Sequence, residues 1–291
     1  MDERARISGL LRRHGLRTSK SLGQHFLIDE DVLSGIAHAL EPDNNSDVVE
    51  IGSGAGNLTV MLALSGATVT GLEVDTKFEP LHREILMTGG SDRLKLRWEY
   101  QDALEFDYAT AARAAHEAGR RFLIAGNIPY QITSPLIMNI LESGAAFDTM
   151  VLMMQREVAE RLAATPGGKK SGSITLKVQY YCEVDPLVDV PPDAFLPPPE
   201  VHSRVMRFKR RDIPASTEPP KFFRLVENAF MHRRKTLANA VASGGLGYSR
   251  EQLEQALRAQ GLPPNVRAEE LGVEQFIALQ QELDQAAAQS R

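Results

Sequence analysis

Short apolar runs rich in β-branched residues alternate with helical patterns between residue 46 and about residue 154. The runs that we expect to form strands are 47–51, 68–73, 94–100, 121–126 and 149–154. The stretches that we expect to form helices are 29–40, 57–65, 76–87, 133–143 and 155–164. Such alternation is typical of a parallel sheet wound with helices. The pattern therefore predicts an α/β fold.

The sheet is expected to close on a different kind of strand pair. A helical pattern over 172–181 is followed by two strand-like runs, 184–190 and 202–209, which the Pro-rich stretch 191–199 separates. No helical pattern lies between the two runs to carry a parallel crossover. We expect them to form a final antiparallel hairpin.

A second, smaller domain is expected after residue 211. Residues 212–220 are prolines and small polar residues with little to bury, which is the composition of a linker. The stretches beyond it with apolar residues at helical spacing are 221–242, 249–260 and 273–287. We therefore expect an α/β domain over 1–211 and a small all-helical domain over 221–291.

Composition restricts the class of protein. The chain has 291 residues, of which 43% are hydrophobic and 24% charged, as in ordinary soluble globular proteins. Four of the first six residues are charged and the stretch contains no apolar signal core, and no apolar run approaches the ~20 residues of a membrane span. We expect a cytoplasmic protein. Cys182 is the single cysteine, and the seven histidines lack ligand spacing, so we predict no disulfide and no metal.

The basic residues are unevenly distributed. The net charge is −5, yet residues 1–27, 204–211 and 221–240 are strongly basic, so the rest of the chain is strongly acidic. A run of charge is often only a solvated face. Three basic segments in an acidic chain also fit a localised phosphate-binding surface, which is how nucleic acids are bound.

A glycine-rich turn follows the first strand of the expected sheet. Gly52, Gly54 and Gly56 have the spacing G-x-G-x-G, directly after the buried run that ends at Ile51. Glycines at this position allow a ligand to approach the backbone closely. Dinucleotide enzymes use G-x-G-x-x-G instead, so a nicotinamide cofactor is disfavoured.

Acidic residues end the next two strands. Glu73 can accept hydrogen bonds from both hydroxyls of a ribose, and Asp102 can accept one from the amino group of an adenine. Ligands bind at the carboxyl ends of strands in open α/β sheets. Asp75 is an alternative ribose partner, although it also suits the N-cap of the helix that follows. The ordered series fits S-adenosylmethionine better than a phosphate-bearing cofactor.

Asn127-Ile128-Pro129-Tyr130 directly follows the apolar run 122–126. The Asn127 side-chain oxygen and the Ile128 carbonyl can accept both N–H protons of an exocyclic amine, Pro129 restricts the backbone, and Tyr130 offers a ring for stacking. Taken alone, these four residues favour an ordinary strand-to-helix turn.

In this order the motifs resemble those of the rRNA adenine N6-dimethyltransferases, and within them the small-subunit KsgA (RsmA) family. The resemblance covers nearly the whole chain. The motifs begin at Ser21 (SLGQHFL), Glu50 (EIGSG), Gln101 (QDA), Asn127 (NIPY), Gln155 (QREV), Gln179 (QYY), Phe195 (FLPPPEVHS) and Ala229 (AFMHRRK). The resemblance implies a Rossmann-like class I methyltransferase sheet, with S-adenosylmethionine as the methyl donor. The implied targets are two adjacent adenines near the 3′ end of 16S rRNA in small-subunit precursors.

The resemblance also implies roles for individual residues. The segment with Gln24, His25 and Leu27 would close over the methionine end of the cofactor, with Gly52 and Gly54 lining the same pocket. Glu73 would hold the ribose, Asp102 the adenine of the cofactor, and Asn127 would lie between cofactor and target. Phe195 would stack on the target adenine opposite Tyr130, although a side chain in such a Pro-rich loop can equally be a core residue.

We expect four basic residues to contact the RNA, Arg204, Arg233, Arg234 and Lys235. The last three lie in a stretch that is otherwise explained as a solvated helix end. We expect a monomer that acts in ribosome biogenesis. The Lys169-Lys170 loop has no role in this interpretation.

Two alternatives stay open. The first is a large-subunit (23S) rRNA adenine methyltransferase of the macrolide-resistance type, which shares the Asn-Ile-Pro-Tyr site. The stretch from Arg267 to Leu279 and the chain length look more like the small-subunit family. The second is a non-catalytic ribosome-assembly or transcription factor on the same fold, against which the complete set Glu73, Asp102, Asn127 and Tyr130 argues.

Overall fold

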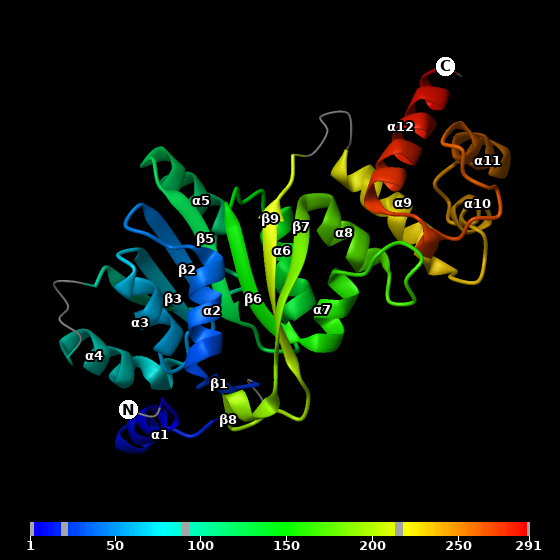
Figure 1. Ribbon diagram of the computed structural model, residues 1–291. Coiled ribbons are helices and arrows are strands. Elements are labelled where there is room, and N and C mark those ends of the chain that lie inside the picture. Colours follow the sequence, from blue (N-terminus) through cyan, green and yellow to red (C-terminus); the bar gives the residue numbers. More distant parts are fainter. Residues whose placement is uncertain (1–2, 19–22, 89–93, 213–217, 290–291) are drawn as a thin grey trace. The chain divides into compact units, whose positions relative to one another are not determined.

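The apolar runs form a seven-stranded sheet in the computed structural model, which describes residues 3–18, 23–88, 94–212 and 218–289 (Figure 1). In spatial order the strands are β4 (Leu96–Tyr100), β3 (Thr68–Glu73), β2 (Ser46–Ile51), β5 (Arg121–Asn127), β6 (Thr149–Gln155), β9 (Ser203–Arg210) and β7 (Cys182–Val190). The pairs from β4 to β6 are parallel, and β9 runs antiparallel to β6. The expected α/β fold is confirmed.

The final hairpin is confirmed by its ion pairs. β7 lies beside β9 at the edge of the sheet. Arg204 pairs with Asp189 and Arg207 pairs with Asp185, so residue numbers fall along β7 as they rise along β9. The two strands are therefore antiparallel.

Chain order reverses beside β2, and this reversal determines where a ligand can bind. The chain goes from β2 outward to β3 and β4, and then returns to the other side of β2 as β5. Ile51 of β2 is paired with Leu72 of β3 and with Gly126 of β5. The loops after the three strands therefore leave the sheet at one edge, which is the usual position of a ligand site in such sheets.

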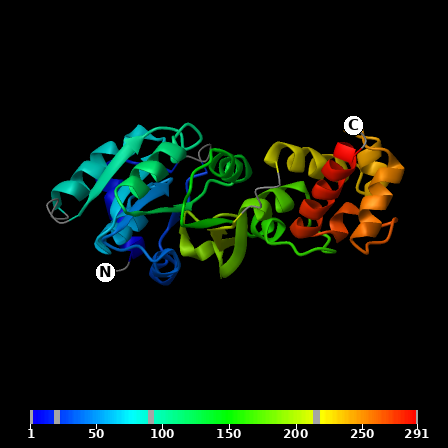
Figure 2. The ribbon, with the colours of Figure 1, turned by 90° about the horizontal axis from the view of Figure 1, so that it is seen from above.

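Helices cover both faces of the sheet (Figures 1 and 2). On one face, α2 (Glu30–Leu40) and α3 (Asn57–Leu64) pack apolar side chains against the strands, and α5 (Tyr108–Glu117) and α6 (Thr133–Glu142) lie on the other. Alternate residues of each strand point to opposite faces, so Leu123 and Ala125 contact the α2 and α3 side. Both faces are apolar, which explains why the runs read as nearly continuous in the sequence.

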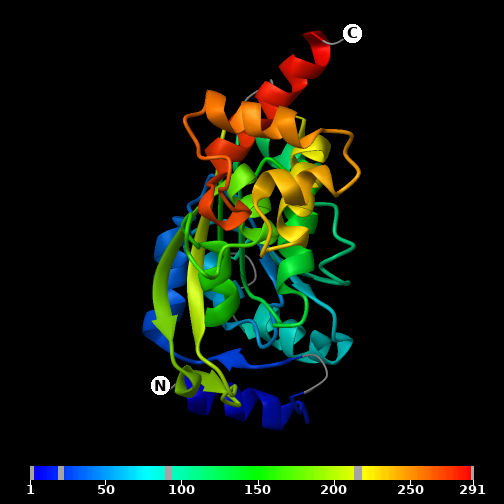
Figure 3. The ribbon, with the colours of Figure 1, turned by 90° about the vertical axis from the view of Figure 1, so that its right-hand side faces the viewer.

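A small layer at the carboxyl edge was not expected from the sequence. β1 (Phe26–Leu27) and β8 (Phe195–Leu196) form a two-stranded antiparallel sheet, with α1 (Glu3–Arg13) beside it (Figure 3). Ile7, Leu10 and Leu11 of α1 are buried in one cluster with residues of the 3-10 turn η2 (Thr76–Phe78) and of α4 (Glu79–Thr88). The layer joins the segment before the sheet to the Pro-rich loop that follows β7.

The rest of the chain forms a second compact unit. It contains residues 160–183 and everything from 211 onward, whereas the first unit contains the residues up to 159 and 184–210. Its elements are the end of α7 (Arg156–Leu162), α8 (Ser173–Tyr181), α9 (Pro219–Met231), α10 (Leu237–Ala242), α11 (Arg250–Ala259), η4 (Ala268–Glu270) and α12 (Val273–Gln289). α9 packs against α8, α10 and α12, and the Tyr180 and Phe222 rings lie 4.4 Å apart.

Two expectations about this region need correction. We placed residues 160–183 in the first domain, but α8 packs with the C-terminal helices, so the second unit is larger than 221–291. We also expected one helix over 221–242. It is interrupted at 232–236, because Thr236 caps the next helix by accepting a hydrogen bond from the Asn239 N–H. The expected linker was 212–220. Residues 213–217 of it lie outside the described residues, and its last two residues belong to α9, which begins at Pro219.

Where the structure describes the chain, none of its helices is both long and apolar enough to cross a membrane.

The close approach of β2 and β5 leads to a testable prediction. A Cβ atom on Gly126 would lie 2.6 Å from the Ile51 carbonyl oxygen, which is backbone and cannot move aside. We expect Gly126→Ala to lower the free energy of unfolding by about 2 kcal/mol, measured by urea denaturation. Gly35→Ala in α2, where a Cβ meets nothing within 4 Å, is the control and should leave stability unchanged or raise it. Equal stability of the two variants would contradict the packing described for β2 and β5.

Candidate active site at the carboxyl edge of the sheet

A pocket opens at the edge where β2, β3 and β5 end. Its walls come from six short stretches of chain between residues 23 and 132. They are 23–27, 50–54, 57–58, 72–74, 101–103 and 127–132, with Leu33 in addition. All eight residues predicted to contact the cofactor line this pocket, as do Ile128, Pro129 and Tyr130.

The glycine turn is tied to the end of β3 by hydrogen bonds. Gly54 has a positive φ of 51°, which favours glycine, and its N–H donates to Glu73 Oε2 at 2.8 Å. The Asp75 N–H donates to Glu73 Oε1 at 2.9 Å. The Gly52 and Ser53 N–H groups both donate to the Leu72 carbonyl at 3.0 Å. The Glu73 carboxyl group is therefore held in one orientation at the pocket wall.

Asp75 and Asp102 differ in their position relative to the pocket, because only Asp102 lines it. Asp75 caps the turn η2 by accepting from the Lys77 N–H, and it is not among the lining residues. This is the alternative role considered for it, so Glu73 is the carboxylate available to a ribose. Asp102 lines the pocket at the end of β4, and its Oδ1 accepts from the Leu104 N–H at 2.9 Å.

The segment 23–27 is held over the pocket by side-chain amides. Asn127 Nδ2 donates to the His25 carbonyl at 2.8 Å, and Asn57 Nδ2 donates to the Leu27 carbonyl. The His25 ring is held by a bond between Nδ1 and the Pro197 carbonyl, at 2.8 Å. Asn57 is a part of the site that motif reasoning missed. Ser21 and Leu22, which begin the same motif, lie outside the described residues.

The Asn127-Ile128-Pro129-Tyr130 segment forms the opposite wall. The Ile128 N–H donates to the Met153 carbonyl at 3.0 Å, and its side chain is buried, so the backbone is fixed against β6. The Tyr130 hydroxyl is 2.8 Å from Ser203 Oγ. The Tyr130 ring lies nearly parallel to that of His25, with centroids 6.2 Å apart. Four stretches from different parts of the chain are thus interlocked around one pocket.

Phe195 does not belong to this site in the structure. Its side chain is 0% exposed and packs in the main core cluster, and it does not line the pocket. A ring needs an exposed face to stack on a base, so the expected role opposite Tyr130 is not supported. The alternative considered from the sequence, a core residue in the Pro-rich loop, is what the structure contains.

Two buried acids give the pocket its electrostatic character. Burial raises the pKa of Glu50 from its ordinary 4.5 to about 8; the nearby Thr59 hydroxyl partly opposes this rise, and the charge of Glu73 adds to it. Burial also raises the pKa of Glu73, and the N–H groups of Asp75 and Gly54 partly oppose this. Glu50 Oε2 has no hydrogen-bond partner among the residues that the structure describes. An unpaired carboxyl oxygen at a pocket wall suits a ligand with a hydrogen-bond donor or a positive charge.

The basic residues predicted to contact RNA are in varied surroundings. In the first unit, Arg204 forms a bidentate pair with Asp189, which neutralises its charge. In the second unit, Arg233 donates to the Ser171 carbonyl at 2.9 Å and also contacts the Lys169 carbonyl. Arg234 and Lys235 are exposed and make no ion pair with any acid in the described part of the chain.

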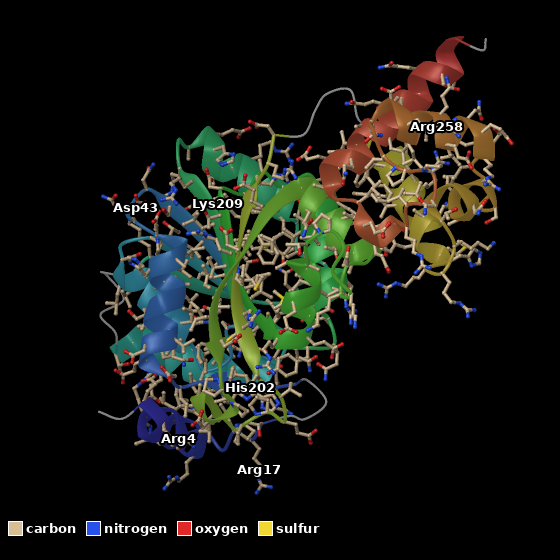
Figure 4. All side chains as sticks on the ribbon, turned by 45° about the vertical axis from the view of Figure 1, so that its right-hand side comes forward. Arg4, Arg17, Asp43, His202, Lys209 and Arg258 are labelled. Carbon is tan, nitrogen blue, oxygen red and sulfur yellow. The ribbon has the colours of Figure 1, made fainter. Side chains whose placement is uncertain are left out.

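The N-terminal basic segment lies at the pocket end of the first unit. Arg4, Arg17 and His202 are at one end of this unit, and Asp43 and Lys209 are at the other (Figure 4). Asp43 precedes the start of β2, so the end with Arg4 and Arg17 is the one where the parallel strands finish. The expected basic segment 204–211 runs along β9 away from this end, and Arg204 and Arg207 are paired with acids.

Among residues 3–18, 23–88, 94–212 and 218–289, no three His, Cys, Asp or Glu side chains gather as metal ligands would.

The sheet order, the glycine turn and the acids at successive strand ends define a class I methyltransferase fold. The sequence profile of the family described as ribosomal RNA adenine dimethylase matches residues 15–285. The chain belongs to the ribosomal RNA adenine dimethylase family.

Individual relatives agree with this assignment. Ribosomal RNA small subunit methyltransferase A of Desulfitobacterium hafniense (strain DSM 10664 / DCB-2) is 40% identical over 281 residues, covering 96% of this chain and 97% of that protein. The protein of the same name from Ligilactobacillus salivarius is 37% identical over 278 residues, covering 94% and 93%.

Two solved structures are also similar. A dimethyladenosine transferase from Plasmodium falciparum has a TM-score of 0.77 at 25% identity, over 90% of this chain and 98% of that one. The 23S rRNA methyltransferase ErmE has a TM-score of 0.70 at 25% identity, over 89% and 99%. The fold is therefore shared by a dimethyladenosine transferase and by a 23S rRNA methyltransferase.

The buried Glu50 predicts how stability depends on pH. Its pKa is about 8 in the folded state, so between pH 4.5 and 8 the unfolded state releases a proton that the folded state retains. Wild-type stability is therefore lost as pH rises through this window. Glu50→Gln cannot ionise, and its stability relative to wild type should rise by a few kcal/mol from pH 4.5 to 8, at about 1.4 kcal/mol per unit. Urea unfolding at both pH values measures this, and a pH-independent difference would contradict the buried state of Glu50.

Proposed function

We propose that this protein uses S-adenosylmethionine to methylate N6 of two adjacent adenines near the 3′ end of small-subunit (16S) rRNA, giving N6,N6-dimethyladenosine during ribosome biogenesis. Family membership supports the reaction, and the relatives named as small-subunit methyltransferases support the target. The observation that carries the proposal is the orientation of the Asn127 amide. Its nitrogen is already used by the His25 carbonyl, which can only accept. The oxygen is therefore what Asn127 offers to a ligand.

The pocket residues fit this cofactor. When bound, S-adenosylmethionine supplies a methyl group that is activated by a positively charged sulfur, and it also carries an ammonium group. Burial favours the protonated forms of Glu50 and Glu73, and a cationic ligand would favour their charged forms, so both carboxyl groups suit such a ligand. We assign Glu73 to the ribose and Asp102 to the adenine of the cofactor. His25, Leu27, Gly52 and Gly54 would enclose the methionine end, with Gln24 at its margin.

The target amine needs acceptors rather than a strong base. The lone pair of an adenine amino group is delocalised into the ring, which makes N6 a poor nucleophile. Asn127 Oδ1 and the Ile128 carbonyl would accept hydrogen bonds from the two N6–H groups. The lone pair of N6 would then point toward the methyl group. The methylated amine is cationic and loses its proton readily, so a neutral amide suffices at position 127. Catalysis would rest on positioning and on preorganised acceptors.

Tyr130 would hold the adenine after it leaves its stack in the RNA. Base-aromatic stacking contributes about 1–3 kcal/mol, comparable with the few kcal/mol that extruding a base costs. The bond between the Tyr130 hydroxyl and Ser203 would keep the ring in place. The pocket must also admit monomethyladenine, which retains one N6–H for the acceptors.

The role of Asn127 can be tested by substitution. We expect Asn127→Ala to lower the rate of methyl transfer to undermethylated small subunits at least about 100-fold. Cofactor affinity should fall far less, by about threefold, because Glu73 and Asp102 are untouched and only the bond from Asn127 to the His25 carbonyl is lost. Radiolabelled transfer and calorimetry measure the two quantities. Asn139→Ala is the control: it removes an amide that donates to the Leu104 carbonyl outside the pocket. Equal loss of transfer and cofactor binding in Asn127→Ala would contradict the role of Asn127 as acceptor.

We further propose that the second unit contacts rRNA phosphates through Arg234 and Lys235, with Arg233 in a supporting position, and that Arg204 is a separate contact of the first unit. Arg234 and Lys235 lie in the exposed break between α9 and α10. Arg233 would hold the Lys169 loop through its two carbonyl contacts while remaining half-exposed.

This surface predicts a change in salt dependence. Arg234→Gln combined with Lys235→Gln should weaken RNA binding and reduce the slope of log affinity against log salt by about 1–2. The control is Arg250→Gln with Arg258→Gln, which removes the same charge from α11, where both arginines pair with Glu254. Filter binding at several salt concentrations measures the slopes. If the two double variants change the slope equally, the contact is not at residues 234 and 235.

A further inference from the structure

A buried histidine from α4 lies against the glycine turn of the pocket. His82 is 1% exposed, and its Nε2 is 2.8 Å from the Gly54 carbonyl oxygen. Its Nδ1 is 2.8 Å from the Tyr100 hydroxyl at the end of β4. No motif points to this histidine, and it does not line the pocket. It nevertheless connects β4 and α4 to the loop that faces the ligand.

The partners of His82 determine its protonation. A carbonyl oxygen can only accept, so Nε2 carries the hydrogen and donates to Gly54. Burial lowers the pKa of His82 to about 4, so the ring is neutral at pH 7. Nδ1 is then an acceptor, and the Tyr100 hydroxyl donates to it. The result is a directed series of hydrogen bonds from Tyr100 through His82 to the Gly54 carbonyl.

Both peptide groups around Gly54 are thereby fixed by buried side chains. Its N–H donates to the Glu73 carboxylate at 2.8 Å, and its carbonyl accepts from His82 at 2.8 Å. The φ of 51° at Gly54 allows the two groups to point to these partners. Loss of either bond would allow the peptide groups of Gly54 to reorient. The Gly54 N–H would then no longer hold the Glu73 carboxylate in its present orientation.

Packing against Trp98 also restricts the ring of His82. It stacks on Trp98 with centroids 4.2 Å apart and an angle of 6° between the planes. A Cβ atom on Gly71 would come within 2.8 Å of the Trp98 ring, and one on Gly56 within 3.2 Å. The aromatic pair therefore fills the space beneath the turn, and the imidazole has little freedom to shift.

We propose that His82 is a positioning residue for the cofactor: its hydrogen bond to the Gly54 carbonyl sets the glycine turn, and through the Gly54 N–H it sets the Glu73 carboxylate for the ribose. This inference rests on the proposed function, because it assumes that the pocket binds S-adenosylmethionine. His82 acts through the turn and does not touch the cofactor.

The test compares two substitutions of similar size. His82→Phe keeps a ring to stack on Trp98 but cannot donate to Gly54, whereas His82→Gln retains an N–H donor at a similar reach. We expect His82→Phe to weaken binding of both S-adenosylmethionine and S-adenosylhomocysteine at least about tenfold, and His82→Gln to recover most of it. Calorimetry measures both affinities. In His82→Phe the KM for the cofactor should rise as the affinity falls, while kcat at saturating cofactor changes less than about threefold.

A control separates positioning from loss of stability. Leu81, the preceding residue of α4, is fully buried in the apolar cluster with Phe78 and is not in the pocket. Leu81→Ala should lower the melting temperature with unchanged cofactor affinity. Tyr100→Phe removes only the hydroxyl that orients the imidazole, and it provides the test if His82→Phe fails to fold. We expect it to weaken cofactor binding about threefold.

The outcomes are distinguishable. If folded His82→Phe binds the cofactor within twofold of wild type, or His82→Gln binds as weakly as His82→Phe, the inference is wrong while the proposed function stands. If His82→Phe does not fold, unchanged affinity in Tyr100→Phe overturns the inference. If wild type itself binds no S-adenosylmethionine, the proposed function fails and the inference fails with it.

Discussion

The contact between β2 and β5 at the point where strand order reverses is the constraint on which the site depends. Gly126 lies against the Ile51 carbonyl so closely that no side chain fits between them. Because the strands are parallel and in register there, the turn after Ile51 and the segment after Gly126 leave the sheet side by side. A Cβ on Gly52 would lie 3.5 Å from the Asn127 carbonyl oxygen. For this reason the glycine turn after Ile51 and Asn127, the proposed acceptor of the target amine, lie next to each other.

Hydrogen bonds that are buried or partly buried hold the polar groups around this contact. Asn127 and Asn57 tie the segment 23–27 over the pocket, and Glu73 and His82 hold the two sides of Gly54. Two oxygens at the pocket wall, Glu50 Oε2 and Ser53 Oγ, are exceptions, because neither has a partner within the described chain. Buried polar atoms are normally paired, so an unpaired one at a pocket wall marks where a ligand completes the structure. A cationic methyl donor would supply what is lacking.

Much of this could be predicted from the sequence, and the limits have physical causes. The strands of the sheet were recognisable because both of their faces are buried, and Glu73, Asp102 and Asn127 were found because they end successive strands. α5 was missed, since two of the three side chains that it buries, Tyr108, Ala112 and Ala115, are small alanines. The break at 232–236 depends on a single cap at Thr236. The burial of Phe195, the unpaired oxygen of Glu50 and the contacts of His82 depend on tertiary packing, which no local pattern reports.

The most direct measurement is mass spectrometry of both rRNAs after undermethylated ribosomal subunits have been incubated with this protein and S-adenosylmethionine. The shared fold of the small-subunit relatives and of the 23S enzyme ErmE makes the position of the product decisive. We predict N6,N6-dimethyladenosine at two adjacent adenines in the 3′-terminal fragment of the small-subunit rRNA, and none in the large-subunit rRNA. Methylation of the large-subunit rRNA instead, or no methylation of either, would contradict the proposed function.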